Sequence, residues 1–255
     1  VVLCNIALMF VPETGTAERA ASQRAAQDAM ADKMGGQGPV VKLFSFVVTT
    51  VLDPLLSFFR KNGMQIGIMI LAFIFLFKIG EAFMGKMSIV FYKEVGFSKS
   101  DIALYSKGLG WITTVTFTLI GGFFALRTGV VRALLISGIA MAGTNILFSV
   151  LAWVGPNELL FAFAVIVDDL AAAFATVAFV TFISLLVDRN YTATQYALLA
   201  SIGTLGRTLL ASSSGALVDG LGGDWGLFFI LTAIMVIPSL LLLWKLRHRL
   251  QNLAK

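Results

Sequence analysis

The chain has 255 residues, of which 58% are hydrophobic and only 13% are charged, and its formal net charge is +5. An average soluble domain is about 25% charged, so this composition excludes an ordinary soluble domain and predicts an all-α integral membrane protein. The basic residues do not form one patch, which argues against a nucleic-acid partner. A single cysteine, Cys4, excludes an internal disulfide, and a single histidine, His248, excludes a histidine-based metal cluster.

Three segments precede the first long apolar run. Residues 1–10 are apolar but too short to cross a bilayer, so we expect the end of a transmembrane helix whose beginning is missing, or else a buried or interfacial segment. Residues 11–40 are polar and rich in alanine and glycine, which predicts a flexible cytoplasmic linker. Residues 41–63 contain Asp53-Pro54 and end near Arg60-Lys61, which favours an amphipathic interfacial helix over another full span.

Six apolar segments follow, and together they predict a six-helix transmembrane bundle over residues 64–246, with a cytoplasmic tail at 247–255. The expected spans are 64–90, 101–126, 131–154, 158–187, 193–219 and 225–246. Basic residues are concentrated in the linker, in the second-to-third and fourth-to-fifth connections and in the tail. The positive-inside rule therefore places the linker and the tail in the cytoplasm.

This order of elements resembles one half of a major facilitator transporter, in which two six-helix halves are joined by a long cytoplasmic linker. We therefore expect the second half of such a fold. The stretch 121–132, "GGFFALRTGVVR", resembles the cytoplasmic loop signature of that superfamily, although Leu126 stands where the signature has an acid.

Charged residues inside the spans are the candidate functional groups, because burying a charge at the bilayer centre costs about 2.5–3.5 kcal/mol. Lys78 and Glu81 lie three residues apart, on one face of the first span. They form either a structural ion pair or a functional pair. In the functional case Glu81 takes a proton, or Lys78 meets an anionic substrate.

The fourth span contains Asp168 and Asp169, whose side chains point about 100° apart on a helix and cannot form a carboxylate dyad by themselves. We expect one to face the cavity and the other a helix contact, and both are candidates for proton coupling. Arg207 in the fifth span needs an anionic partner. Asp168 or Asp169 is the expected one, and an anionic ligand is the alternative.

Two further polar residues lie within spans. Lys107 either extends to the membrane interface or binds substrate. Asn145 in the third span either makes a helix–helix hydrogen bond or contacts the ligand.

Residues 75–246 resemble the AmpG-type muropeptide permeases of the major facilitator superfamily. The resemblance rests on "KIGEAF", "VGFSKSDIALYSKGLG", "VRALLISGI", "DDLAAAFATVAFV" and "YTATQYALLASIGTLGR". The chain departs from the family pattern at Asp168-Asp169, where Glu-Asn is expected, and at 172–175, where alanines replace glycines.

The resemblance implies proton-driven import of anhydro-muramyl peptides across the bacterial inner membrane, for cell-wall recycling, without any cofactor besides the proton gradient. Partners would be the muropeptide, the lipid bilayer and the missing N-terminal six-helix half. The carboxylates of the stem peptide would suit Arg207, Lys78 or Lys107, while Glu81 and Asp168 would carry the proton.

Three alternatives remain at this point. The same helices can transport another solute, or the chain can be a half that does not transport by itself. A membrane enzyme is disfavoured, because the sequence has no metal constellation and no membrane-embedded Ser/His pair.

Overall fold

The computed structural model describes residues 21, 25, 28–29, 41, 48–188 and 191–253. Segment 1–10 and most of 11–40 lie outside these residues. All elements of the described part are helical, which confirms the predicted all-α membrane architecture. Within the described residues, five stretches are long and apolar enough to cross a membrane: Met64–Val95, Lys99–Thr128, Val130–Val154, Glu158–Leu186 and Trp225–Leu250. The chain divides into two units, residues 1–61 with 188–195 and residues 62–187 with 196–255.

The smaller unit contains the π-helical turn η1 (Val48–Leu52) and most of helix α4 (Asp53–Asn62). Pro54 lies in the first turn of α4, directly after η1. The amide of buried Gln195 connects this turn to the segment before α11. Its Nε2 donates to the carbonyl of Pro54 at 2.8 Å, and its Oε1 accepts from the N–H of Asp188 at 2.6 Å. Gln195 therefore has a structural role in this unit.

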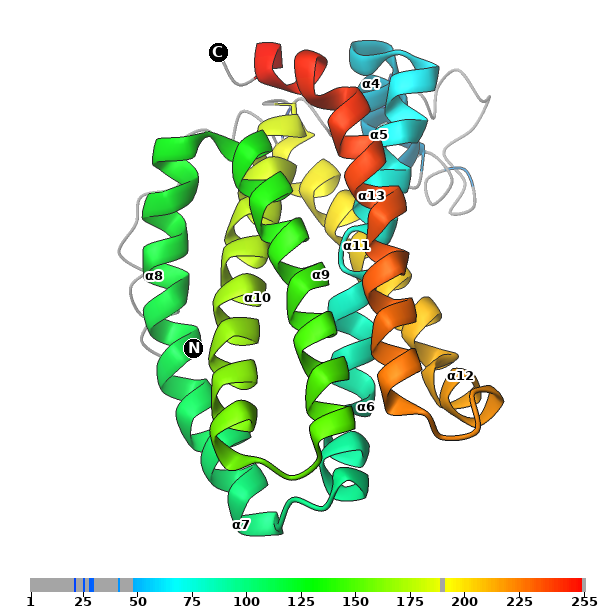
Figure 1. Ribbon diagram of the computed structural model, residues 1–255. Coiled ribbons are helices and arrows are strands. Elements are labelled where there is room, and N and C mark those ends of the chain that lie inside the picture. The colour runs from blue at the N-terminus through cyan, green and yellow to red at the C-terminus, as the bar shows by residue number, and fades with distance from the viewer. Residues whose placement is uncertain are drawn as a thin grey trace. The chain divides into compact units, whose positions relative to one another are not determined.

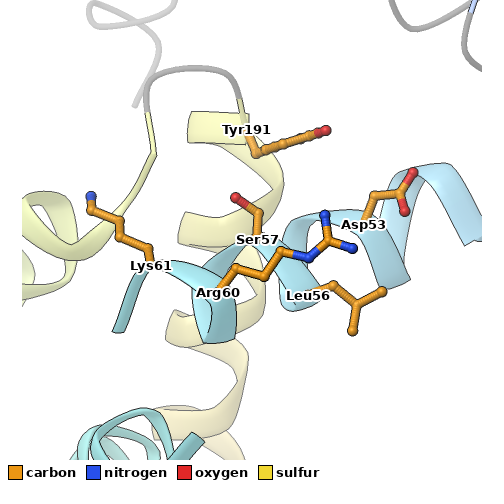
Figure 2. A pocket seen from close by; sticks show the side chains of 6 residues that line it. All are labelled: Asp53, Leu56, Ser57, Arg60, Lys61 and Tyr191. Carbon is orange, nitrogen blue, oxygen red and sulfur yellow. The ribbon is translucent and has the colours of Figure 1, made fainter. Parts of the chain in front are cut away.

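The same unit contains a polar pocket of about 580 Å³ (Figure 2). In Figure 2, the guanidinium of Arg60 extends toward the side of the pocket where Asp53 lies, the hydroxyl of Ser57 points toward Tyr191, and Lys61 points away from Asp53. Because an acid lies among the cations, the pocket has mixed charge. It is not a distinct anion site.

The first span of the larger unit is two helices, α5 (Met64–Leu76) and α6 (Ile79–Val95), rather than the single helix predicted over 64–90. The second span begins with the short helix α7 (Lys99–Asp101), continues as the π-helix η2 (Ile102–Leu109) and ends as α8 (Gly110–Thr128). A capping box between Ser98 and Asp101 explains this start, because each side chain accepts from the other residue's backbone N–H.

The third and fourth spans match their predicted ranges closely, as α9 (Val130–Val154) and α10 (Glu158–Leu186). Gly129 joins α8 to α9 with a φ of 82°, a backbone angle that favours glycine. The side chain of Asn157 caps α10 by accepting from the N–H of Leu160 at 3.0 Å.

The last part of the chain differs from the prediction in two ways. The segment predicted as a fifth span over 193–219 is divided into α11 (Thr192–Ser212) and α12 (Ser214–Gly220), and neither is among the five long apolar stretches. Helix α13 (Trp225–Leu253) continues well past residue 246, so most of the predicted tail, up to residue 253, is helical.

Helix α9 packs against both α10 and α13, and α10 also packs against α8 (Figure 1). A cluster of aromatic rings fills the core near the connection between α12 and α13. Its contacts join Phe91, Tyr92, Phe148, Phe161, Trp225, Phe228 and Phe229. Each such pair contributes about 0.5–1.5 kcal/mol beyond its buried area. The other face of α8 exposes large apolar side chains, among them Trp111, Leu119 and Leu126, as expected of a surface in contact with lipid.

Candidate functional site

The candidate site begins at the interruption between α5 and α6. The N–H of Phe77 donates to the carbonyl of Phe73, and that of Ala82 donates to the carbonyl of Lys78, but the helical ladder is broken between these two bonds. Gly80 in the first turn of α6 packs closely against α13 and α9, because an added Cβ would lie 2.7 Å from Val236 and 3.0 Å from the amide nitrogen of Asn145. The break therefore lies at Lys78, three residues before Glu81, so that charged side chains occur at the interruption of a span.

Lys78 lies at this break and has two partners. Its ammonium donates to the hydroxyl of Thr176 on α10 at 2.7 Å and lies 2.8 Å from the Oε2 atom of Glu81. The Lys78 and Glu81 side chains are only 13% and 20% exposed. The predicted pairing of Lys78 with Glu81 on one face is therefore confirmed as an ion pair.

Arg207 on α11 also contacts Glu81, with its Nη2 atom 3.7 Å from Oε1. The prediction that Asp168 or Asp169 is the partner of Arg207 is wrong. The aspartates are directed to other helices instead, because Asp168 accepts a hydrogen bond from Thr144 on α9 and Asp169 accepts one from Thr113 on α8.

The two aspartates point in different directions, as their helical spacing predicts. Asp168 accepts from the hydroxyl of Thr144 on α9 at 2.8 Å, and Asp169 accepts from the hydroxyl of Thr113 on α8. Both side chains are half-buried. Among the described residues, the ion pairs of Lys78 and Arg207 are with Glu81 and not with either aspartate.

Asn145 and Lys107, which the sequence also indicated, lie outside this cluster. Asn145 is 2% exposed, and its Nδ2 atom faces Gly80 without a hydrogen-bond partner. Lys107 is exposed on η2 and has no ion pair within the described residues.

Sequence reasoning missed three threonines that hold the charged groups, Thr113, Thr144 and Thr176. Threonines are common in apolar helices and bond to their own backbone, as each of these also does. These three differ from the other threonines only because a charged side chain of another helix lies beside them, which the sequence alone does not show.

The chemistry available to this arrangement is ionic. Within the part of the chain that the structure describes, no three histidine, cysteine or acidic side chains are grouped so that they could hold a metal ion. The side chains present can bind an anion, exchange a proton and change ion-pair partners.

The chain matches known transporters over about four-fifths of its length. It is 33% identical over 202 residues to a protein of Rickettsia conorii named "Putative transporter AmpG 4", a match that covers 79% of this chain and 48% of that protein. It is 31% identical over 202 residues to the "Anhydromuropeptide permease" of Escherichia coli K12, covering 79% of this chain and 40% of that protein. A protein of Rickettsia bellii, "Putative transporter AmpG 1", is 29% identical over 205 residues, with 78% and 50% covered.

The chain thus spans about half the length of the relatives it matches. No family model matches it. All three relatives bear the names of transporters or permeases and none bears the name of an enzyme, which agrees with the class of protein predicted from the sequence.

Proposed function

Because this chain is homologous to about half of an AmpG-type permease, we propose that it forms the C-terminal six-helix half of a proton-coupled importer of anhydro-muropeptides. Such an importer recovers peptidoglycan fragments for cell-wall recycling across the bacterial inner membrane. In this proposal the other half of the transporter is the partner of this chain, and the basic connections support a cytoplasmic linker and C-terminus.

The observation that carries this proposal is the cluster of charges at the interruption of the first span. Lys78, Glu81 and Arg207 meet at an interrupted helix, where transporters commonly bind substrate. A muropeptide carries carboxylates in its stem peptide, and paired cations suit such groups. Glu81, Asp168 and Asp169 are the proposed proton carriers, since carboxylates inside a membrane typically serve in proton relays.

The polar residues outside the cluster have secondary roles in this proposal. Lys107 is exposed at the start of the second span and attracts the anionic substrate. Asn145 directs its unpartnered amide toward the first turn of α6 and offers a hydrogen-bond donor there.

The test is uptake of labelled N-acetylglucosaminyl-anhydro-muramyl tripeptide by the whole permease that contains this chain, reconstituted in liposomes with an imposed proton gradient. We expect accumulation that depends on the gradient. Uptake that ignores the gradient would contradict proton coupling, and transport of unrelated solutes alone would contradict the substrate.

Variants that replace a carboxylate with a neutral amide distinguish a role in proton coupling from a role in folding. Glu81→Gln and Asp168→Asn should abolish accumulation driven by the gradient but retain exchange of labelled for unlabelled substrate. The control is Glu158→Gln, because Glu158 is exposed at the start of α10 and bonds only to Tyr105 among the described side chains. It should transport normally. Loss of both accumulation and exchange, with less folded protein, would indicate a structural role instead.

A further inference from the structure

The pocket of the smaller unit is formed by one face of α4 and by Tyr191 (Figure 2). Asp53, Ser57 and Arg60 follow one another at spacings of four and three residues, so they lie on the same face of the helix. The residues that complete the lining are Leu56 and Lys61. The volume of about 580 Å³ lies within the range of small-molecule sites, about 300–1,000 Å³. The pocket is therefore large enough to hold a small polar group.

The charges of this pocket are separated from one another and unpaired. Asp53 lies in the first turn of α4, whereas Arg60 and Lys61 lie in its last turn. Within the part of the chain that the structure describes, none of these three side chains forms an ion pair. The hydroxyl of Ser57, midway along the helix, points toward Tyr191 (Figure 2). A ligand that satisfies both ends of the pocket must carry a negative group and a positive group of its own.

Both segments that line the pocket adjoin the ends of spans on one side of the membrane. Helix α4 ends at Asn62, and the first span begins at Met64. Tyr191 follows the fourth span, which ends at Leu186. The four spans from Met64 to Leu186 return the chain to the side on which it starts. Leu56, which lines the pocket, is 50% exposed. Charged groups and an exposed apolar side chain thus lie close in sequence to the membrane surface, where phospholipid headgroups are found.

We propose that this pocket binds the headgroup of a phospholipid that carries a primary amine, that is, a phosphoethanolamine group. The side chains of Arg60 and Lys61 donate to its phosphate, and its ammonium donates to the carboxylate of Asp53. The hydroxyls of Ser57 and Tyr191 supply neutral donors for the phosphate. A soluble phosphoethanolamine compound has the same chemistry, but the adjoining spans favour the lipid. The proposal holds for any transported solute and therefore goes beyond the proposed function.

Asp53 determines which headgroup the pocket prefers. A phosphocholine headgroup has the same phosphate and the same net charge, but its quaternary ammonium has no N–H group to donate to a carboxylate. Proteins recognise such ammonium groups with cages of several aromatic rings. Tyr191 is the only aromatic residue among the six that line this pocket. We therefore expect phosphatidylethanolamine to bind more tightly than phosphatidylcholine.

The first experiment measures lipid retention by the full chain. The purified chain in detergent is mixed with equal amounts of dioleoyl-phosphatidylethanolamine and dioleoyl-phosphatidylcholine, and native mass spectrometry counts the lipid that stays bound. We expect a preference of about tenfold for the ethanolamine lipid, the effect of one charge-assisted hydrogen bond. Asp53→Asn should remove most of this preference, and Asp53→Glu should keep it. The matched Asp219→Asn should behave like wild type, because Asp219 is exposed on α12 and forms no ion pair among the described residues.

Two results of this experiment would overturn the proposal. The first is a preference that Asp53→Asn leaves unchanged. The second is stronger retention of the ethanolamine lipid by Asp53→Asn, since the pocket would then act as a simple anion site. If Asp53→Asn does not fold, Arg60→Gln gives an independent test, because it should weaken retention of both lipids. Arg132→Gln is its control, since Arg132 is exposed on α9 and has no ion pair in the described ranges. Equal retention by Arg60→Gln and Arg132→Gln would also overturn the proposal.

The second experiment distinguishes the lipid from a soluble ligand of the same chemistry. Glycerophosphoethanolamine has the same headgroup without acyl chains, and it is added to the chain that holds dioleoyl-phosphatidylethanolamine. At an equal concentration it should not displace the lipid. Equal competition between the two would overturn the lipid as the occupant of the pocket.

Discussion

The ammonium of Lys78 donates to the hydroxyl of Thr176 at 2.7 Å and thereby joins the interruption of the first span to the middle of α10. The same ammonium lies 2.8 Å from Glu81. Lys78 is therefore held between two helices. Its position depends on a neutral hydroxyl as well as on its counterion.

Replacing Thr176 with valine should loosen this connection. Thr176→Val keeps the shape of the side chain but removes the acceptor for Lys78, so we expect a loss of about 0.5–1.5 kcal/mol in the free energy of unfolding. Thermal unfolding in detergent measures it. The matched control is Thr181→Val, because Thr181 bonds only to the carbonyl of Val177 on its own helix. Equal losses in the two variants would contradict a role for the contact between helices.

The bond between Thr144 and Asp168 should be visible in a double-mutant cycle. Thr144→Val leaves the half-buried carboxylate without its donor on α9, which we expect to cost about 1–3 kcal/mol. In the Asp168→Ala background the same substitution should cost about 1 kcal/mol less, because the carboxylate is already gone. Additive effects on the melting temperature would show that the two side chains do not interact.

The sequence was sufficient for the helical membrane fold and for the positions of most spans. The third and fourth spans begin and end within one residue of prediction, since Gly129, Asn157 and the apolar runs define them locally. The interruption at Phe77–Lys78 was missed. It contains no proline, and it depends on close packing by helices distant in sequence.

The sequence indicated the three charged residues of the cluster, but only one of their two pairings. Lys78 with Glu81 followed from helical spacing, because the partners are three residues apart. The pairing of Arg207 with Glu81 joins α11 to α6, and no local pattern distinguishes it from a pairing with the aspartates. The threonine donors to Asp168 and Asp169 were missed for the same reason.

Gly206 tests the close approach of α11 to the broken span. A Cβ added at Gly206 would fall on the carbonyl oxygen of Phe75, which lies in the last turn of α5. Gly206→Ala should therefore lower the free energy of unfolding by about 1–3 kcal/mol. In contrast, Gly143→Ala on α9 meets no atom within 4 Å and should be neutral or stabilise by up to about 1 kcal/mol. Similar melting temperatures for the two variants would exclude the close approach.

Arg207 should determine the affinity of the whole permease for its anionic substrate. Arg207→Gln removes the half-exposed cation at Glu81, and we expect at least about a tenfold loss of kcat/KM for uptake, or about 1.4 kcal/mol. Arg207→Lys keeps the charge but loses the planar guanidinium, so its kcat/KM should lie between that of Arg207→Gln and that of wild type. Concentration-dependent uptake of labelled anhydro-muramyl tripeptide measures both.

The control for this charge is Lys245→Gln, since Lys245 is exposed on the later part of α13 and forms no ion pair among the described residues. It should transport like wild type, which would separate loss of a cation at the site from loss of net charge. A substrate whose stem carboxylates are converted to amides gives the complementary result. If Arg207 binds a carboxylate, Arg207→Gln should weaken uptake of the acid far more than uptake of the amide. Equal weakening of both would show that Arg207 acts through Glu81 or through packing rather than by contact with the substrate.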